Sequence, residues 1–351
     1  MSPAPPAVTS KDITFRVSDS DHELDGVRLE LDWHSEAQTL DFSPEPQGWS
    51  LTIPRPEAGR LEYQLTLRTG DHHHWTTDTT NPRKVPNPFG PKSELLLPGY
   101  TEPGWLHSPD TGTVGDVVVP PGFDPPVPVR LWSPDGLAAD TPAPLLIAND
   151  GSDLADRGSL LRWAGATVAG GRTGPFRVAL LDPPQGYRDD WYAADEGYSD
   201  EIAGTVLPAL RAAAPTTAVI GLGASLGAVA MLCLQDRHPD SVDALALQSG
   251  SFFTRALDPQ ESGFTHFERL CRAAERLAVR TTSRPVPVLL TCGTLEENRA
   301  NNGLMAQALR TQGYPVRCRW VGDAHTMIGW RDAWGTDLAD LIVAATDGWN
   351  P

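Results

Sequence analysis

The chain has 351 residues, of which 40% are hydrophobic and 21% are charged, and its formal net charge is −17. This is the composition of a globular protein, and the length exceeds one typical hydrophobic core, so we expect two domains. The negative charge argues against binding to nucleic acid or to anionic membranes. The first residues lack a secretion-signal pattern and no stretch approaches about 20 apolar residues, which predicts a soluble, cytoplasmic protein.

Residues 10–80 alternate apolar and polar side chains in short runs separated by turn residues. The clearest runs are VRLEL at 27–31, WSLTI at 49–53 and LEYQLTL at 61–67. Strands with period 2 predict a small β-sandwich domain over residues 1–80. Residues 81–111 are rich in proline and glycine and are predicted to form an ordered linker over the next domain.

From residue 112 the pattern changes to apolar strands alternating with helices. The predicted strands lie at 114–119, 127–132, 144–149, 176–182, 217–222, 243–248, 286–292 and 315–321, and the predicted helices at about 155–169, 199–213, 226–237, 262–278, 301–312 and 332–346. Such alternation predicts an α/β domain over 112–351, with a doubly wound, mostly parallel sheet covered on both faces.

Two features of the chain could suggest metal binding. The first is the histidine triplet at 72–74. Successive side chains of a strand face opposite sides, so an exposed hairpin edge is the better interpretation. The second is a set of four cysteines: Cys233, Cys271, Cys292 and Cys318. Their spacing is not that of metal ligands, so we interpret them as reduced, buried apolar residues. We therefore expect no metal site.

Ser225 lies in the pentapeptide GASLG at 223–227, between a β-branched run and a helical stretch. A serine at a tight strand-to-helix turn is a nucleophile elbow, and the glycines relieve crowding where the chain reverses. The amide of Leu226 then lies at a helix N-terminus, where it can stabilise a developing oxyanion. These residues predict a serine hydrolase.

A serine nucleophile needs a histidine base that follows it in the chain. His238 ends the elbow helix and His266 lies in an amphipathic helix, so neither suits the role. His325 lies in a polar loop directly after the strand predicted at 315–321. We therefore predict His325 as the base.

The acid that orients the histidine is expected in the loop after the strand at 286–292. Glu296 and Glu297 both lie there, and neighbouring side chains point in different directions. We choose Glu296, with Glu297 as the alternative, and a dyad without either acid stays open. All these positions follow strands at the edge of the sheet where ligands bind in α/β folds.

The second oxyanion donor is expected after the strand at 144–149. Here the amide of Ser152, next to Gly151, is the candidate. Asp150 is interpreted as structural, bonding the amides of its own turn.

The chain resembles the enterochelin (ferric siderophore) esterase family, whose members are relatives of the esterase D and feruloyl esterase group within the α/β-hydrolases. The resemblance spans nearly the whole length. It is carried by LEYQ at 61–64, DTTNP at 78–82, SELLLPGY at 93–100, the GASLG elbow, GTLEEN at 293–298 with Asn301, and His325 followed by Trp330 and Arg331.

The resemblance implies an immunoglobulin-like N-terminal domain, Ser225 as nucleophile, His325 as base and a carboxylate at Glu296 or Glu297. Its members hydrolyse catecholate trilactones bound to iron, so the implied partner is a small-molecule ester, with iron arriving as part of an iron–siderophore substrate. The chemistry itself needs no cofactor.

Two further residues take roles from the same resemblance. Arg188 could face an anionic catecholate, or it could be a surface residue paired with Asp189 or Asp190. Trp330 could line the pocket or brace the histidine loop. We take bracing as the better interpretation of Trp330.

The chain also departs from the family pattern, with TVLPA at 205–209 and DAHT at 323–326. These changes leave the chemistry intact but weaken the assignment of the ester. The alternatives are a feruloyl or other carbohydrate esterase, and an acyltransferase. A non-catalytic protein whose sandwich binds glycan is a further alternative, and it rests on fold analogy alone.

Overall fold

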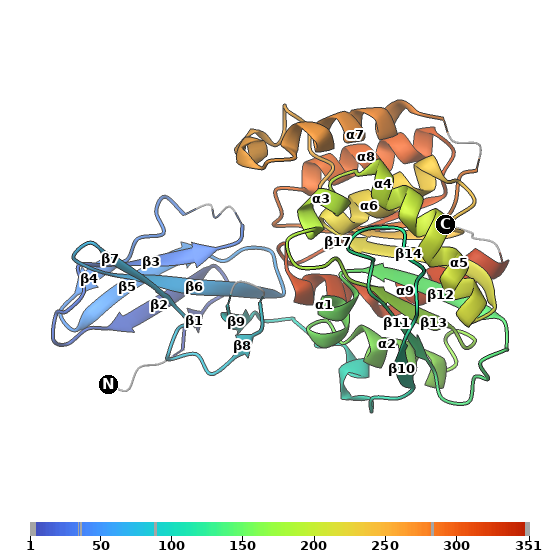
Figure 1. Cartoon of the computed structure of the whole chain (residues 1–351). Helices are drawn as coiled ribbons and strands as arrows, with labels where there is room; N and C mark the ends of the chain where they lie inside the picture. The colour runs from blue at the N-terminus through green and yellow to red at the C-terminus, as the bar shows by residue number, and fades with distance from the viewer. Residues whose placement is uncertain (1–4, 34, 36, 88–89, 282–283, 348–351) are drawn as a thin grey trace. The chain divides into compact units, whose positions relative to one another are not determined.

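The computed structural model describes residues 5–33, 35, 37–87, 90–281 and 284–347, and it divides into two compact units (Figure 1). The first unit contains the described residues up to Thr101 together with two later segments, Gly293–Glu297 and Gly322–Gly329. The second unit contains Glu102–Cys292, Asn298–Val321 and the described residues from Trp330 onward.

The first unit contains two antiparallel sheets. One has the strand order β1-β2-β5-β4, and the other has the order β3-β6-β9-β8 with β7 paired to β6. The strands are β1 (Ala7–Val8), β2 (Asp12–Ser18), β3 (Gly26–Leu31), β4 (Ser43–Glu45), β5 (Gly48–Pro54), β6 (Arg60–Thr69), β7 (His72–Thr76), β8 (Lys84–Val85) and β9 (Lys92–Leu96).

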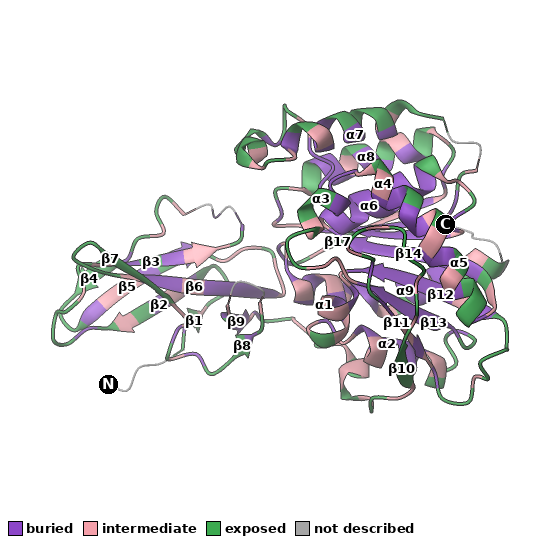
Figure 2. Ribbon diagram, viewed as in Figure 1, coloured by how far each residue is buried: buried purple, intermediate pink, exposed green. Residues whose placement is uncertain are grey.

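The two sheets share one apolar core because their strands alternate as the sequence predicts. In β2, Ile13 and Phe15 are buried while their neighbours are more exposed. Leu29 of β3 and Leu61 of β6 belong to the same buried cluster. Figure 2 shows β6 buried along most of its length. The alternating burial of β2 is typical of sheets that pack face to face, whereas β6 is buried on both faces over its first four residues.

The prediction of a linker over 81–111 is wrong for the part that contains β8 and β9. Strand β9 pairs with β6 across the register Arg60↔Leu96 to Tyr63↔Ser93, and β8 pairs with β9. The Asn81 amide, which donates to the Glu94 carbonyl at 2.8 Å, anchors the start of this segment. The prolines and glycines fall between short strands, so the sandwich continues beyond residue 80.

The histidine triplet lies on β7, and all three side chains are exposed. The strand forms a hairpin with β6, with His72 opposite Thr69. Within the described part of the chain, no group of three or more His, Cys, Asp or Glu side chains is arranged to hold a metal ion.

The second unit is built on a mixed sheet of eight strands. The order is β10-β11-β13-β12-β14-β15-β16-β17, where β10, β11 and β13 pair antiparallel and the run from β13 through β16 is parallel. The strands are β10 (Thr113–Asp116), β11 (Val129–Ser133), β12 (Ala143–Asn149), β13 (Arg177–Leu181), β14 (Thr216–Ala224), β15 (Ala244–Gln248), β16 (Val288–Gly293) and β17 (Val316–Val321).

Helices lie on both sides of this sheet, with α6, α7 and α8 on one side and α1 and α2 on the other (Figure 1). The helices are α1 (Gly151–Asp156), α2 (Leu160–Ala169), α3 (Arg188–Tyr192), α4 (Glu196–Glu201), α5 (Leu207–Ala213), α6 (Leu226–Arg237), α7 (Phe267–Val279), α8 (Arg299–Thr311) and α9 (Met327–Asp347). Short 3-10 turns lie at Gly104–His107 and Pro259–Gly263, and a π turn at Ile202–Val206.

The central strands are apolar on both faces because helices cover both. Seven consecutive residues of β14, from Ala218 to Ala224, are buried, as are all of β13 and β15 (Figure 2). The mixed α/β architecture predicted for this region is therefore confirmed. The helix predicted at 155–169 is divided into α1 and α2 at Ser159, which has φ of 60°.

None of the helices formed by the described residues is both long enough and apolar enough to cross a membrane. The four cysteines are free thiols, and three of them are buried, with Cys318 partly exposed. Burial raises the pKa of the Cys233 thiol to about 12, so this thiol stays protonated at neutral pH.

Candidate active site

Ser225 lies between the end of β14 and the start of α6, with φ of 55° and ψ of −123°. Its amide donates to the Gln248 carbonyl at 2.8 Å, which joins the turn to the end of β15. A Cβ at Gly223 would come within 2.2 Å of the Gly227 carbonyl oxygen, so the reversal requires glycine there. A strained, partly exposed serine at this turn has the geometry of a nucleophile elbow.

Leu226 is the first residue of α6. Amides in the first turn of a helix have no intrahelical acceptor and carry the positive end of the helix dipole. The Leu226 side chain is buried in the core, which fixes the start of the helix. Its amide is therefore suited to hold an anion.

The loop after β15 carries a residue that the sequence analysis missed. The Ser251 hydroxyl lies 3.2 Å from that of Ser225, and its amide donates to the Ser225 carbonyl at 3.2 Å. Asn302 of α8 holds this loop through both the amide and the carbonyl of Gly250, at 3.0 and 2.7 Å. The signal was available, since Ser251 follows the strand next to the elbow strand.

His325 and Glu296 lie in the first unit, in its two later segments. His325 Nδ1 lies 2.8 Å from Glu296 Oε2. The other oxygen, Oε1, accepts the Gly293 amide at 2.7 Å, so the buried carboxylate is held at both ends. A carboxylate on Nδ1 directs the hydrogen to that nitrogen and leaves Nε2 as the basic position.

Glu297 is exposed, in contrast to Glu296. The two adjacent side chains therefore point in different directions, Glu296 into the protein and Glu297 toward solvent. Gly293 makes room for this loop, because a Cβ there would come within 2.4 Å of the Asp323 carbonyl oxygen. Glu296 is thus the carboxylate with the geometry of a triad acid.

The two other histidines that follow the elbow are paired with carboxylates. His238 Nε2 lies 2.7 Å from Asp200 Oδ1, and His266 Nε2 lies 2.7 Å from Asp190 Oδ1. These contacts engage Nε2, whereas the contact of His325 with Glu296 engages Nδ1, which is the arrangement expected of a base held by an orienting acid.

Ser152 does not present a free donor. Its amide donates to Asp182 Oδ1 at 2.8 Å, and its hydroxyl donates to the other oxygen at 2.5 Å. Asp182 directly follows β13, which pairs with β12. Its carboxylate therefore reaches the turn after β12, where Ser152 lies. This geometry gives the Ser152 amide a structural partner and weakens its assignment to the oxyanion hole.

Arg188 pairs with a carboxylate that was not among the expected partners. Its Nε and Nη2 donate to the two oxygens of Asp150 at 2.8 and 2.7 Å, while Asp189 lies 3.8 Å away. Burial opposes the charged form of Arg188, but the Asp150 carboxylate outweighs it and raises the arginine pKa. The Asp150 carboxylate therefore binds Arg188 and makes no capping hydrogen bond to the amides of its own turn, so the turn-bonding role predicted for it is wrong. A bidentate partner of this kind competes with an anionic ligand for Arg188.

Trp330 is bonded on both its side chain and its backbone. The indole Nε1 donates to Ser249 Oγ at 2.9 Å, and its carbonyl accepts from Gln248 Nε2 at 3.0 Å. These bonds connect the start of α9 to the end of β15, and the bracing of the histidine loop by Trp330 stays a prediction.

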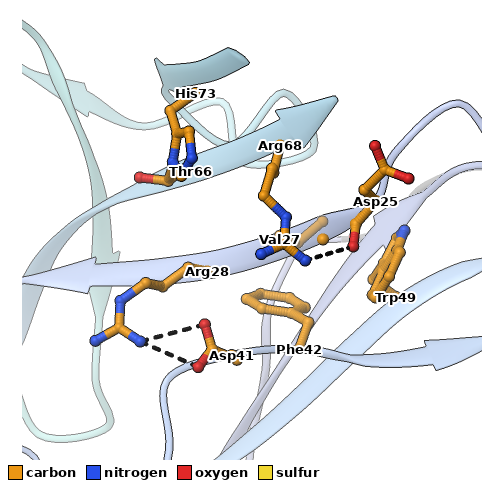
Figure 3. Close-up of a pocket in the computed structure, with 10 residues that line it drawn as sticks. Asp25, Val27, Arg28, Asp41, Phe42, Trp49, Thr66, Arg68 and His73 are labelled. Carbon is orange, nitrogen blue, oxygen red and sulfur yellow. Dashed lines mark hydrogen bonds and ion pairs between the residues drawn. The ribbon is translucent and has the colours of Figure 1, made fainter. Parts of the chain in front are cut away.

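The described part of the first unit contains a cavity of about 360 Å³ (Figure 3). It is lined by ten residues from β3, β5, β6, β7 and adjacent loops, among them Phe42, Trp49 and His73. Its arginines already have partners, since Arg28 binds Asp41 at 3.2 Å and Arg68 donates to the Asp25 carbonyl at 2.8 Å (Figure 3). None of the predicted catalytic residues lines this cavity.

Comparison with known proteins gives a fold but no sequence family. No protein-family model matches the chain, and no curated protein matches it. The enterobactin esterase of Shigella flexneri, solved in the presence of enterobactin, aligns with a TM-score of 0.74 and 17% identity over 95% of this chain and 94% of that one. The ferric enterobactin esterase of Salmonella typhimurium aligns with a TM-score of 0.71 and 16% identity, over 95% and 93%.

A ferulic acid esterase aligns over a smaller part, with a TM-score of 0.56 and 15% identity over 66% of this chain and 99% of that one. The fold of enterobactin esterases therefore extends over both units of this chain, whereas the feruloyl-type match covers about two thirds of it. The resemblance to the enterochelin esterase family is thus confirmed as a likeness of fold.

Proposed function

We propose that this protein is a serine esterase in which Ser225 is the nucleophile, His325 the base and Glu296 the orienting acid. The observation that carries the proposal is the backbone of Ser225, held at φ of 55° and ψ of −123° at the start of α6. A non-glycine residue in this conformation costs free energy, and strain of this kind is concentrated at functional sites. The Ser225 hydroxyl belongs to a partly exposed residue at this turn, as a nucleophile elbow requires.

The topology supports bringing the three residues together. Strands β14 and β16 belong to the parallel run, and β17 lies next to β16 in the sheet. Loops that leave the carboxyl ends of parallel strands start at one edge of a sheet. The contact between His325 and Glu296 supplies the second half of the proposed triad.

The reaction is an acyl transfer in two steps. His325 Nε2 takes the hydroxyl proton as Ser225 attacks the ester carbonyl, and the new oxyanion is held by the Leu226 amide, a donor of a kind worth about 3 kcal/mol. The imidazolium, stabilised by Glu296, then gives its proton to the departing alcohol. Water repeats the sequence on the acyl-enzyme, releasing the acid and restoring the serine.

We propose a catecholate siderophore ester as the substrate, with any iron arriving on it. The support is that the alignment with enterobactin esterases extends over both units, while a feruloyl esterase covers only about two thirds of the chain. Arg188 is engaged by Asp150, so we leave it out of the substrate contacts.

The first test uses reagents that report on a serine nucleophile whatever the natural ester is. A fluorophosphonate should label the wild-type protein at Ser225, located by peptide mass spectrometry, and the Ser225→Ala variant should lose both this label and turnover of a p-nitrophenyl ester. Circular dichroism should show the variant folded. Retained turnover in Ser225→Ala would refute the assignment.

The substrate is tested by comparing kcat/KM for an iron-loaded catecholate trilactone with that for a feruloyl sugar ester. We expect the trilactone to be preferred by at least tenfold. Preference for the feruloyl ester would favour the carbohydrate-esterase alternative. Transfer of the acyl group to an added alcohol in place of water would identify an acyltransferase.

A further inference from the structure

Arg60 is a buried cation in the first unit, at the start of β6, and only 1% of it is exposed. Its guanidinium is bonded at all three nitrogens. Nε donates to Glu94 Oε1 at 2.9 Å, Nη2 to Glu62 Oε1 at 2.7 Å, and Nη1 to Asp323 Oδ2 at 2.9 Å and Thr326 Oγ1 at 3.2 Å.

The carboxylates around Arg60 are buried as well, so the cluster is held by mutual pairing. Burial opposes the charge on Arg60, but Asp323, Glu62 and Glu94 outweigh it and raise the arginine pKa. Burial raises the pKa of Glu62 in spite of the neighbouring guanidinium. Removing one member of such a cluster leaves the others buried and uncompensated, so its geometry is strongly constrained.

The cluster has one side within the sandwich and one side on the histidine loop. Glu62 and Glu94 belong to β6 and β9, whereas Asp323 and Thr326 flank His325. Asp323 Oδ1 accepts from the Ala324 amide at 2.7 Å, so the guanidinium and the loop backbone share one carboxylate.

Backbone hydrogen bonds and apolar packing also join the sandwich to the loops that carry Glu296 and His325. The Gly59 amide donates to the Gly322 carbonyl at 2.9 Å, and the Leu295 amide donates to the Asp323 carbonyl at 3.2 Å. Ala324 is part of the sandwich core, and Leu295 packs against it. The loops of the proposed base and the proposed acid are therefore built onto the sandwich.

We propose that Arg60 is a positioning residue that acts through Asp323 and Thr326 to hold His325 on Glu296, so that the sandwich is a working part of the esterase. The inference rests on the proposed function. Its physical basis is that proton transfer requires hydrogen-bond geometry, and a displacement of about 1 Å can cost about 100-fold in rate. Arg60 carries no proton in the reaction and touches no substrate.

The test compares a change at the guanidinium with a change elsewhere in the same sandwich. Asp323→Asn removes a charge bonded to Arg60 on the histidine-loop side, and Tyr63→Phe removes a buried hydroxyl that donates to Asp78 at 2.7 Å and is not bonded to Arg60. We expect both variants to lower the urea midpoint of unfolding. Asp323→Asn should lower kcat for a p-nitrophenyl ester by about 10- to 100-fold with KM within about twofold, while Tyr63→Phe stays within about threefold in kcat.

A second measurement reads the histidine directly. The Nδ1 proton of His325 should give a downfield proton NMR signal, assigned by its loss in Glu296→Gln. We expect this signal in the wild type and in Tyr63→Phe, and its broadening by exchange in Asp323→Asn. If Asp323→Asn fails to fold, Thr326→Val, which removes one hydroxyl from the same side, should show the same broadening with a smaller loss of kcat.

Two results would overturn the inference. One is a loss of kcat in Tyr63→Phe as large as in Asp323→Asn, which would mean that activity follows stability alone. The other is an unchanged signal and kcat in Asp323→Asn and Thr326→Val. A wild-type protein without fluorophosphonate labelling at Ser225 would instead refute the proposed esterase, so the two failures are distinguishable.

Discussion

The elbow around Ser225 and the loop around His325 are built in opposite ways. The elbow depends on glycines within two positions of the serine and on the neighbouring strand β15. The histidine loop is held by Arg60, which lies 263 positions before Asp323 in the chain. One half of the proposed site is therefore a local backbone constraint, and the other is a long-range electrostatic one.

The two halves of the proposed site are therefore sensitive to different kinds of substitution. A larger side chain at the elbow collides with adjacent backbone atoms, so its effect is confined to the turn itself. A change in the support of His325 acts through buried charges, whose loss is felt wherever the partners lie.

The largest effect is expected at the contact between Glu296 and His325. Glu296→Gln keeps the shape but offers an amide to Nδ1, which favours the wrong tautomer of the imidazole. We expect kcat to fall by about 10³- to 10⁴-fold with little change in KM. Steady-state kinetics on a p-nitrophenyl ester measures this effect.

Glu297→Gln is the matched control, since it makes the same chemical change one position along the same loop on an exposed side chain. It should leave kcat within about twofold of wild type, as surface changes usually do. A larger loss in Glu297→Gln than in Glu296→Gln would reverse the assignment of the acid.

A smaller but still large effect is expected at Gly223. In Gly223→Ala the new Cβ meets the Gly227 carbonyl at 2.2 Å, so the turn must shift. We expect a loss of about 3 kcal/mol in the free energy of unfolding and about 100-fold in kcat. Urea unfolding and ester hydrolysis measure the two effects separately.

Gly204 provides the control for this change, because a Cβ there would meet nothing within 4 Å and it lies within a helical turn. Gly204→Ala should be neutral or stabilising by up to about 1 kcal/mol. Equal stability of both alanine variants would show that the elbow is not under the constraint described.

The sequence was sufficient for the features that depend on local pattern. The continuous apolar runs of β12 to β16 and the glycines of the elbow place Ser225, because a strand buried on both faces and a tight turn each leave a mark within about ten residues. The polar loop that carries His325 was found in the same way.

The features that could not be predicted from the sequence depend on pairing between distant residues. Strand β9 falls within the predicted linker because its pairing with β6 leaves no mark in the local sequence pattern. Ser152 is engaged by Asp182, Arg188 by Asp150 and Arg60 by Asp323, and no periodicity encodes which carboxylate meets which donor. Polar partners are set by the tertiary fold, so they become predictable only once the strand order is known.

The smallest effect is expected at an exposed charge cluster of the second unit, which offers a contrast with the buried Arg60 cluster. Asp200 accepts from Arg237 Nε at 2.6 Å and lies 2.7 Å from His238 Nε2. Hydrogen bonds from Arg237 and then His238 lower its pKa to about 2. A carboxyl with a lowered folded-state pKa stabilises the fold above its unfolded value near pH 4 and loses that contribution as the pH falls toward about 2.

Asp200→Asn should therefore lower the free energy of unfolding at neutral pH by less than about 1 kcal/mol, and less still in about 1 M salt, because solvent screens exposed pairs. Urea unfolding at neutral pH and near pH 3 should show the wild type approaching the variant as acid is added. A loss that equals that of Asp323→Asn and persists in high salt would mean that burial is not what separates the two clusters.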